Sequence, residues 1–215
     1  LIEALRGELA TAQEQLLAAA AVLTAARTAA ASAFAQAVSA ELEDLAMPGA
    51  SVEFVLEPCP PAAHGADAVA FGLRSRPGAP WVPLSKGASG GELSRIMLAV
   101  EVVLASADPM GTFIFDEVDA GIGGAAGVEI GKRLARLART SQVIVVTHLP
   151  QVAAFADRHL VVARSTEEQV HSSGISEVTG EERVAELARM LAGLADSAAG
   201  ESLARELIEL AAQHS

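Results

Sequence analysis

The first 46 residues carry the pattern that most restricts the fold, because their apolar side chains repeat every seven residues. One line of the repeat holds large aliphatic residues and the other is mostly alanine. The two lines are Ile2, Leu9, Leu16 and Leu23, and Leu5, Ala12, Ala19, Ala26 and Ala33. This spacing predicts a coiled-coil helix, in which alanine lets a partner helix approach closely. The alternative is an amphipathic helix packed on its own domain.

A helix over residues 1–46 would be about 70 Å long at the usual rise per residue. Pro48 and Gly49 are expected to end it. The chain opens with Leu1 directly inside this pattern, which suggests a piece of a longer protein. Thr24, Arg27 and Thr28 interrupt the alanine-rich tract, so we expect neither a membrane-spanning helix nor a signal peptide.

Net charge and cysteine content further restrict the class of protein. The net charge of −12 disfavours a large nucleic-acid contact surface on this chain by itself, because phosphate neutralisation needs clustered Lys and Arg. The single cysteine, Cys59, excludes an internal disulfide framework and suits a reducing cytoplasm.

Beyond residue 47 the pattern changes to alternating short strands and helices. Strand, helix and strand in succession after residue 111 predict an α/β fold with a parallel sheet. The segments 111–117 and 141–148 contain the apolar runs FIF and VIVV, which predict strands buried on both faces. The other expected strands are 51–57, 68–75 and 158–165, and the expected helices are 89–106, 124–139, 150–157, 181–192 and 198–212.

Loops are expected at 58–67 and 76–83. In the helix 89–106, one apolar face is expected to be buried. That face is made of Leu93, Ile96, Met97, Val100 and Val103.

The stretch LSKGASGGELSR, residues 84–95, predicts an anion site. Ser89, Gly90 and Gly91 stand where a helix begins, and the unpaired N–H groups there lie at the positive end of the helix dipole. A phosphate would fit, yet the sequence contains no GxxxxGK[ST] phosphate loop. Glu92 either belongs to this site or is an ordinary acid in the first turn of a helix.

Two further groups are expected at the carboxyl ends of the strands, where ligands bind in open α/β sheets. Asp116 and Glu117 follow the run TFIF, and adjacent residues there point in different directions. One carboxylate could hold Mg²⁺ while the other polarises a water, which are the roles that phosphoryl transfer needs. His148 follows the run VIVV and could contact a terminal phosphate. Taken singly, both groups could equally be solvated.

Together the three groups are far more specific. ASGGELSR, FIFDEVDAG and VVTHLPQVA, in that order and spacing, resemble the signature motif, Walker B motif, D-loop and switch histidine of the ATP-binding-cassette superfamily. The long helix before the signature motif is similar to that of the SMC branch. Within it, the motifs look most like the bacterial ATPases that repair DNA double-strand breaks.

The resemblance implies a division into 1–46, one arm of an antiparallel coiled coil, and 47–215, the C-terminal lobe of an ATPase head. It implies ATP and Mg²⁺ as ligands. The implied partners are the N-terminal Walker A lobe of the same protein, a second head in a homodimer, and DNA through the full assembly, with no membrane. The implied location is the bacterial cytoplasm, at the nucleoid.

The resemblance also implies a role for each site residue. Two heads sandwich two ATP molecules, so that the signature loop of one head caps a phosphate held by the other. The implied phosphate contacts are Ser89, Gly90, Gly91 and Glu92, with Asp119 in the D-loop at the dimer seam. Asp116 would assist Mg²⁺, Glu117 would be the base that activates water, and His148 would sense the γ-phosphate.

The sequence also allows three alternative functions, which it supports to different degrees. The segment GIGGAA, 121–126, matches a dinucleotide-binding fingerprint, but the next strand ends in VVTH instead of the acid that such folds need. A transporter cassette is disfavoured by the arm and by Glu92, where transporters more often carry Gln. A nucleotide-gated structural clamp with incidental hydrolysis stays open, although the presence of Glu117 favours hydrolysis.

Overall fold

The computed structural model describes residues 1–105, 111–164, 173–192 and 198–214. The chain divides into two compact units. The first unit combines residues 1–43 and 47–89, and the second combines residues 44–46 and 90–215.

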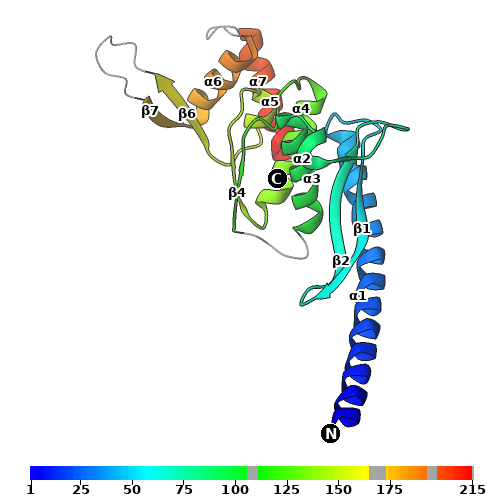
Figure 1. Cartoon of the computed structure of the whole chain (residues 1–215). Coiled ribbons are helices and arrows are strands. Elements are labelled where there is room, and N and C mark those ends of the chain that lie inside the picture. Colours follow the sequence, from blue (N-terminus) through cyan, green and yellow to red (C-terminus); the bar gives the residue numbers. More distant parts are fainter. Residues whose placement is uncertain (106–110, 165–172, 193–197, 215) are drawn as a thin grey trace. The chain divides into compact units, whose positions relative to one another are not determined.

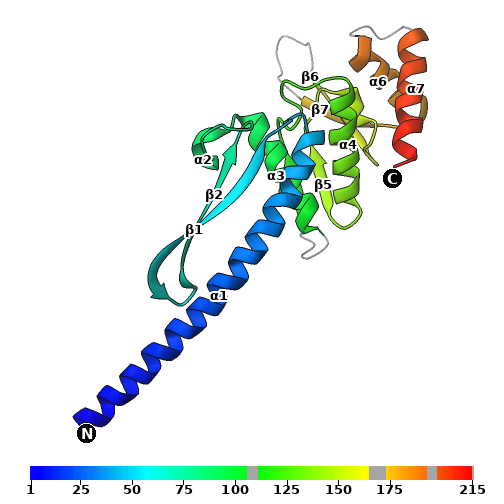
Figure 2. The same cartoon turned by 90° about the vertical axis from the view of Figure 1, so that its right-hand side faces the viewer.

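The first unit is a long helix beside an antiparallel sheet. Its elements are α1 (Ile2–Asp44), β1 (Ser51–Ala62), β2 (Gly65–Arg74), β3 (Val82–Pro83) and α2 (Leu84–Gly87). The strands pair in the order β1-β2-β3. The β1–β2 hairpin runs along the C-terminal half of α1 (Figures 1 and 2). The predicted long helix and both predicted strands are therefore confirmed.

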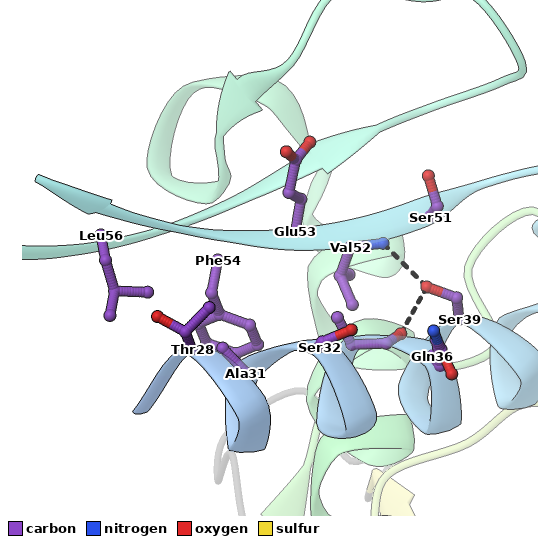
Figure 3. A pocket seen from close by; sticks show the side chains of 11 residues that line it. Thr28, Ala31, Ser32, Gln36, Ser39, Ser51, Val52, Glu53, Phe54 and Leu56 are labelled. Carbon is purple, nitrogen blue, oxygen red and sulfur yellow. Dashed lines mark hydrogen bonds between the residues drawn. The ribbon is translucent and has the colours of Figure 1, made fainter. Parts of the chain in front are cut away.

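Aromatic stacking and one serine attach this half of α1 to the sheet. The ring of Phe54 lies 5.7 Å from that of Phe34 on α1 and 4.4 Å from that of Phe71 on β2. The Ser39 hydroxyl accepts a hydrogen bond from the Val52 N–H, at 3.1 Å, and donates one to the Ala35 carbonyl, at 2.7 Å (Figure 3). Residues 34–39 of α1 are thus fixed to the sheet.

A buried carboxylate makes a second attachment. Asp67 on β2 accepts a hydrogen bond from the Thr24 hydroxyl, at 2.7 Å, and pairs with the Arg27 guanidinium, at 3.0 Å. Arg27 also donates to the His64 carbonyl in the hairpin turn. The hydrogen bond from Thr24, followed by Arg27, lowers the pKa of Asp67 although burial opposes this. Thr24 and Arg27, two of the polar residues that interrupt the alanine tract, therefore bind the hairpin.

The N-terminal half of α1 exposes its aliphatic line to solvent in this chain. The exposed residues are Leu1, Ile2, Leu5, Leu9, Leu16, Leu17, Val22 and Leu23. By length and composition alone, α1 is long and apolar enough to cross a membrane, with a mean hydropathy of 1.5 over 18 residues, which the sequence analysis did not anticipate. Alanine is common in α1 and raises this mean, whereas membrane insertion is favoured most by Leu, Ile, Phe and Val.

The loop predicted for 58–67 is wrong over most of its length, because β1 extends to Ala62 and β2 begins at Gly65. Prolines are tolerated here because β1 is an edge strand, and the pairing becomes irregular between Pro58 and Ala62. The predicted loop 76–83 likewise ends in β3, which α2 follows.

The second unit contains the predicted parallel strands and their helices. Its elements are α3 (Gly90–Leu104), β4 (Thr112–Phe115), α4 (Ala125–Ala138), β5 (Gln142–Val145), α5 (Pro150–Ala153), β6 (His159–Arg164), β7 (Ser173–Val178), α6 (Gly180–Ala192) and α7 (Ala198–Ala212). β4 and β5 pair in parallel, with α4 between them in sequence and close to β5 in Figure 2.

Helices α5, α6 and α7 share a hydrophobic core. Its buried residues are Ala153, Ala154, Phe155, Val184, Leu187, Ala188, Ala204, Leu207 and Ala211. Arg183 on α6 donates hydrogen bonds to the carbonyls of Ala153, Ala154 and Ala156. These bonds satisfy carbonyl groups at the C-terminal end of α5 and fix the segment that follows His148.

Three predictions about the second unit are wrong. β6 pairs with the unforeseen strand β7 in an antiparallel sheet and does not extend the parallel one. The strands β4 and β5 are not buried on both faces, since Ile114 is 71% exposed and Ile144 is 45% exposed. On α3, Ile96 is buried as predicted, but Leu93 and Met97 are exposed, and Leu98, Ala99 and Val102 are buried outside the predicted face.

Candidate active site

The parallel pairing of β4 with β5 brings two predicted site segments to one edge of the sheet. Phe115 is paired with Val145, and the Val146 N–H donates to the Phe115 carbonyl at 3.0 Å. Asp116 and Glu117 leave one strand at this edge, and His148 follows the other. All three residues are exposed. The carboxylates and the imidazole are therefore accessible to a ligand.

The start of α3 packs against the turn that follows β4. The Ser94 hydroxyl donates to the Asp116 carbonyl at 2.9 Å, and the Arg95 guanidinium donates to the Ala120 carbonyl at 3.2 Å. A Cβ built on Gly90 would lie 2.9 Å from Glu117 Oε2, and one on Gly91 would lie 2.9 Å from the Ala120 Cβ. Gly91 is thus required for the close approach of α3 to this turn, whereas at Gly90 a side chain would displace only the Glu117 carboxylate.

Glu117 has an unusual backbone conformation. Its φ is 59°, in the left-handed region that residues other than glycine seldom adopt. Such a conformation costs on the order of 1–2 kcal/mol and is found most often at functional sites. The turn conformation therefore supports a special role for this carboxylate.

Ser89 and Glu92 flank the glycine pair. Ser89 is exposed, Gly91 is buried and Glu92 is half-buried in the first turn of α3. An α-helix leaves its first N–H groups without acceptors inside the helix, so the N terminus of this 15-residue helix is suited to an anion. Ser89 directly precedes Gly90 in the sequence. The contact of Ser89 with a phosphate stays a prediction.

Asp119 is buried, and it holds the segment that carries His148. Its Oδ2 accepts hydrogen bonds from the Thr147 hydroxyl and, at 3.1 Å, from the His148 N–H. His148 Nδ1 lies 3.2 Å from the same oxygen. The Thr147 hydroxyl also accepts from the Leu149 N–H at 3.0 Å. The structure thus joins Asp119 and His148, which belong to different motifs in the sequence.

The exposed carboxylates have the chemistry to hold Mg²⁺ where phosphate oxygens supply further ligands. No cluster of three or more His, Cys, Asp or Glu side chains suited to a metal occurs in the described ranges. Mg²⁺ is commonly held by one or two carboxylates together with substrate phosphates, so a closed protein cage is not needed. Asp116, exposed at the strand end, matches that requirement.

Thr147 and Arg95 hold the turns around the candidate site, and the sequence did not predict either contact. Arg95 is buried, and burial lowers its pKa. Within the described part of the chain, its Nε has no hydrogen-bond partner. The only sequence signals were a hydroxyl directly before His148 and a charge on an otherwise apolar face of α3.

A groove of about 580 Å³ lies apart from these residues in sequence, between α1 and β1 of the first unit (Figure 3). Its lining includes Thr28, Ser32 and Gln36 from α1 and Val52 and Phe54 from β1. None of the predicted site residues lines it.

Solved structures show which fold the chain has. It is similar to the Smc head domain with a coiled coil and joint from Pyrococcus yayanosii, with a TM-score of 0.56 and 24% identity over 75% of this chain and 29% of that one. It is also similar to the Smc head domain with an extended coiled coil from Pyrococcus furiosus, with a TM-score of 0.53 and 23% identity over 71% of this chain and 36% of that one. The chain therefore has the α/β fold of part of an SMC-type ATPase head.

The sequence itself matches the bacterial DNA repair protein RecN. It is 56% identical to RecN of Streptomyces coelicolor over 202 residues, which is 88% of this chain. It is 50% identical to RecN of Mycobacterium tuberculosis over 233 residues, which is 98% of this chain. The chain spans only 35% and 38% of the length of these two proteins. No family model matches it. The chain is thus a relative of RecN.

Proposed function

We propose that this chain is the lobe of a RecN-like ATPase that caps and hydrolyses ATP bound on other lobes. The observation that carries the proposal is the gathering of Gly90, Glu117 and His148 at the carboxyl edge of β4 and β5. The sequence offers no phosphate loop to hold a nucleotide itself. The anion site and the acid therefore act on a phosphate that another lobe binds.

Each residue has a distinct task in this proposal. Ser89, Gly90 and Gly91 donate to a phosphate at the N terminus of α3, with Glu92 fixing the first turn. Glu117 takes a proton from the attacking water. Asp116 holds Mg²⁺, which neutralises charge on the phosphates when it is bound. His148 contacts the γ-phosphate, and Asp119 lies at the seam between two heads.

The exposed apolar side of β4 and β5 is suited to packing against another lobe, which supports the N-terminal Walker A lobe of the same protein as a partner. Ile114, Ile144 and Val146 are 71%, 45% and 61% exposed. Parallel sheets are normally covered on both faces, and a two-stranded one cannot cover itself. The exposed leucine line of α1 similarly suits the second helix of an antiparallel coiled coil.

The assembly that follows is a homodimer of heads closed by two ATP molecules. DNA is contacted through the full assembly, because the charge of −12 disfavours DNA binding by this chain alone. A role in repairing double-strand breaks puts the protein in the bacterial cytoplasm, at the nucleoid.

Replacing Glu117 by Gln in the full-length protein tests the proposal. The substitution keeps size and removes the base, so we expect ATP turnover to fall by about 10²- to 10⁴-fold. ATP affinity should change little, because Asp116 and the phosphate contacts remain. Turnover measured with and without linear DNA, beside equilibrium ATP binding, checks both points.

Turnover at the wild-type rate would show that Glu117 is not the base. The structural-clamp alternative makes a different prediction, namely that cells carrying Glu117→Gln repair breaks normally although hydrolysis is lost. Survival after DNA damage therefore separates an ATPase from a clamp.

A further inference from the structure

Asp119 is buried beside an exposed histidine. The Asp119 residue is 2% exposed, whereas the His148 side chain is 70% exposed. One carboxylate oxygen of Asp119 meets the Thr147 hydroxyl, the His148 N–H and His148 Nδ1. The carboxylate thus contacts both the backbone and the ring of His148.

We propose that Asp119 is a positioning residue that acts through His148, by fixing which ring nitrogen faces the γ-phosphate. The inference rests on the proposed function and adds to it a role for Asp119 within its own chain. It leaves the predicted place of Asp119 at the dimer seam as a separate prediction.

The chemistry of the contact determines the tautomer. A carboxylate only accepts hydrogen bonds, so a lone pair on Nδ1 facing Asp119 would be repelled. The proton of the ring is therefore on Nδ1, and Nε2 faces away from the buried oxygen. A ring held in this way presents Nε2 to the solvent-exposed side. There a neutral ring accepts a hydrogen bond from the attacking water, and a ring protonated on both nitrogens donates from Nε2 to the phosphate.

The surrounding bonds hold this arrangement against rotation. The His148 N–H and the Thr147 hydroxyl bind the same oxygen, and Thr147 accepts from the Leu149 N–H, directly before Pro150 begins α5. The segment 147–149 is therefore fixed at the backbone as well as at the ring. A free histidine would instead sample several rotamers and both tautomers.

The substitution Asp119→Asn in the full-length protein tests the role. Asparagine keeps an oxygen for the backbone N–H but loses the charge that fixes Nδ1–H. We expect kcat for ATP to fall about 10- to 100-fold, as for other groups that orient a functional histidine, with KM nearly unchanged. A fall in ATP affinity instead of kcat would contradict the proposal.

The double variant Asp119→Asn/His148→Gln shows whether the two residues act together. If Asp119 acts through His148, the double variant should be no slower than His148→Gln alone, because coupled residues are not additive. A further tenfold loss in the double variant would mean that Asp119 acts by another route, and would overturn the inference.

A matched control is available in the first unit. Asp67 is also a buried aspartate that contacts a hydroxyl and a side-chain nitrogen, so Asp67→Asn makes the same chemical change away from the ATP-site residues. We expect it to leave kcat unchanged. An equal loss in Asp67→Asn would show that removing any buried carboxylate slows the protein, and would contradict a specific role for Asp119.

A measurement on the wild-type protein covers the case in which Asp119→Asn fails to fold. In ¹⁵N-histidine-labelled protein, with His148 assigned by comparison with His148→Gln, the neutral ring should carry its proton on Nδ1. The Nε2–H tautomer would overturn the inference. Wild-type turnover no faster than that of Glu117→Gln would instead refute the proposed function.

Discussion

At the scale of single residues, two glycines differ in what surrounds them. A Cβ on Gly90 would meet only Glu117 Oε2, at 2.9 Å. A Cβ on Gly131 of α4 would meet the ring of Phe155, at 2.4 Å from Cδ2. The first neighbour is the end of a flexible side chain and the second is a buried ring in the helical core. The same methyl group should therefore have different effects at the two positions.

Gly90→Ala is expected to slow hydrolysis while the fold stays intact, because the Glu117 carboxylate must move. Gly131→Ala is expected to lower the free energy of unfolding by about 1–3 kcal/mol through overpacking. Parallel measurements of ATP turnover and thermal unfolding on the two full-length variants check this. A large loss of stability in Gly90→Ala, with normal turnover, would refute the placement of Glu117 beside the glycine pair.

At the scale of secondary-structure elements, the attachment of α1 to the β1–β2 hairpin depends on an ionised Asp67. Its pKa is lowered, chiefly by the Thr24 hydrogen bond and also by Arg27. The stabilisation that ionised Asp67 gives the folded protein is therefore complete above the ordinary aspartate pKa of about 3.9. It is lost as pH falls through the lowered pKa of Asp67 in the folded protein.

We predict that attachment of the hairpin is independent of pH from neutrality down to about pH 4 and weakens below it. Hydrogen exchange of the amides in α1 and β2, at a series of pH values, measures this. In Asp67→Asn the hairpin should be attached less strongly than in the wild type at pH 7. In acid this difference in amide protection should disappear. A constant difference across the whole range would contradict the role of the charge.

The helices were largely predictable because their apolar periodicity is long. The heptads of α1 and the boundaries of α3, α4, α6 and α7 followed from spacing alone. The end of β1 did not, because Pro58 and the prolines after it suggest a loop unless the strand is known to lie at an edge. The exposure of Leu93 and Met97 was also hidden, because periodicity marks an apolar face without showing what covers it.

The candidate site was predictable as motifs and not as contacts. Gly90, Glu117 and His148 were predicted as site residues because their segments have a distinctive order, and their roles stay a prediction. The bonds between Asp119 and His148 join residues 29 positions apart in sequence. Only the parallel pairing of β4 and β5 brings them together. Local sequence carries no signal for such a contact.

At the scale of the whole molecule, we propose that each ATP site combines residues of two chains. Glu117 of one subunit should work with Ser89 of the other, because a symmetric head dimer repeats the same interface twice. In Glu117→Gln the base is missing from both sites. In Ser89→Arg a bulky cation blocks phosphate capping in both.

The most direct measurement is ATP turnover of a heterodimer purified with two different tags, one subunit carrying Glu117→Gln and the other Ser89→Arg. One site then combines both defects, whereas the other combines a wild-type Glu117 with a wild-type Ser89. We predict that each homodimer is nearly inactive and that the heterodimer recovers about half of the wild-type rate. A heterodimer no more active than either homodimer would contradict a site shared between two chains.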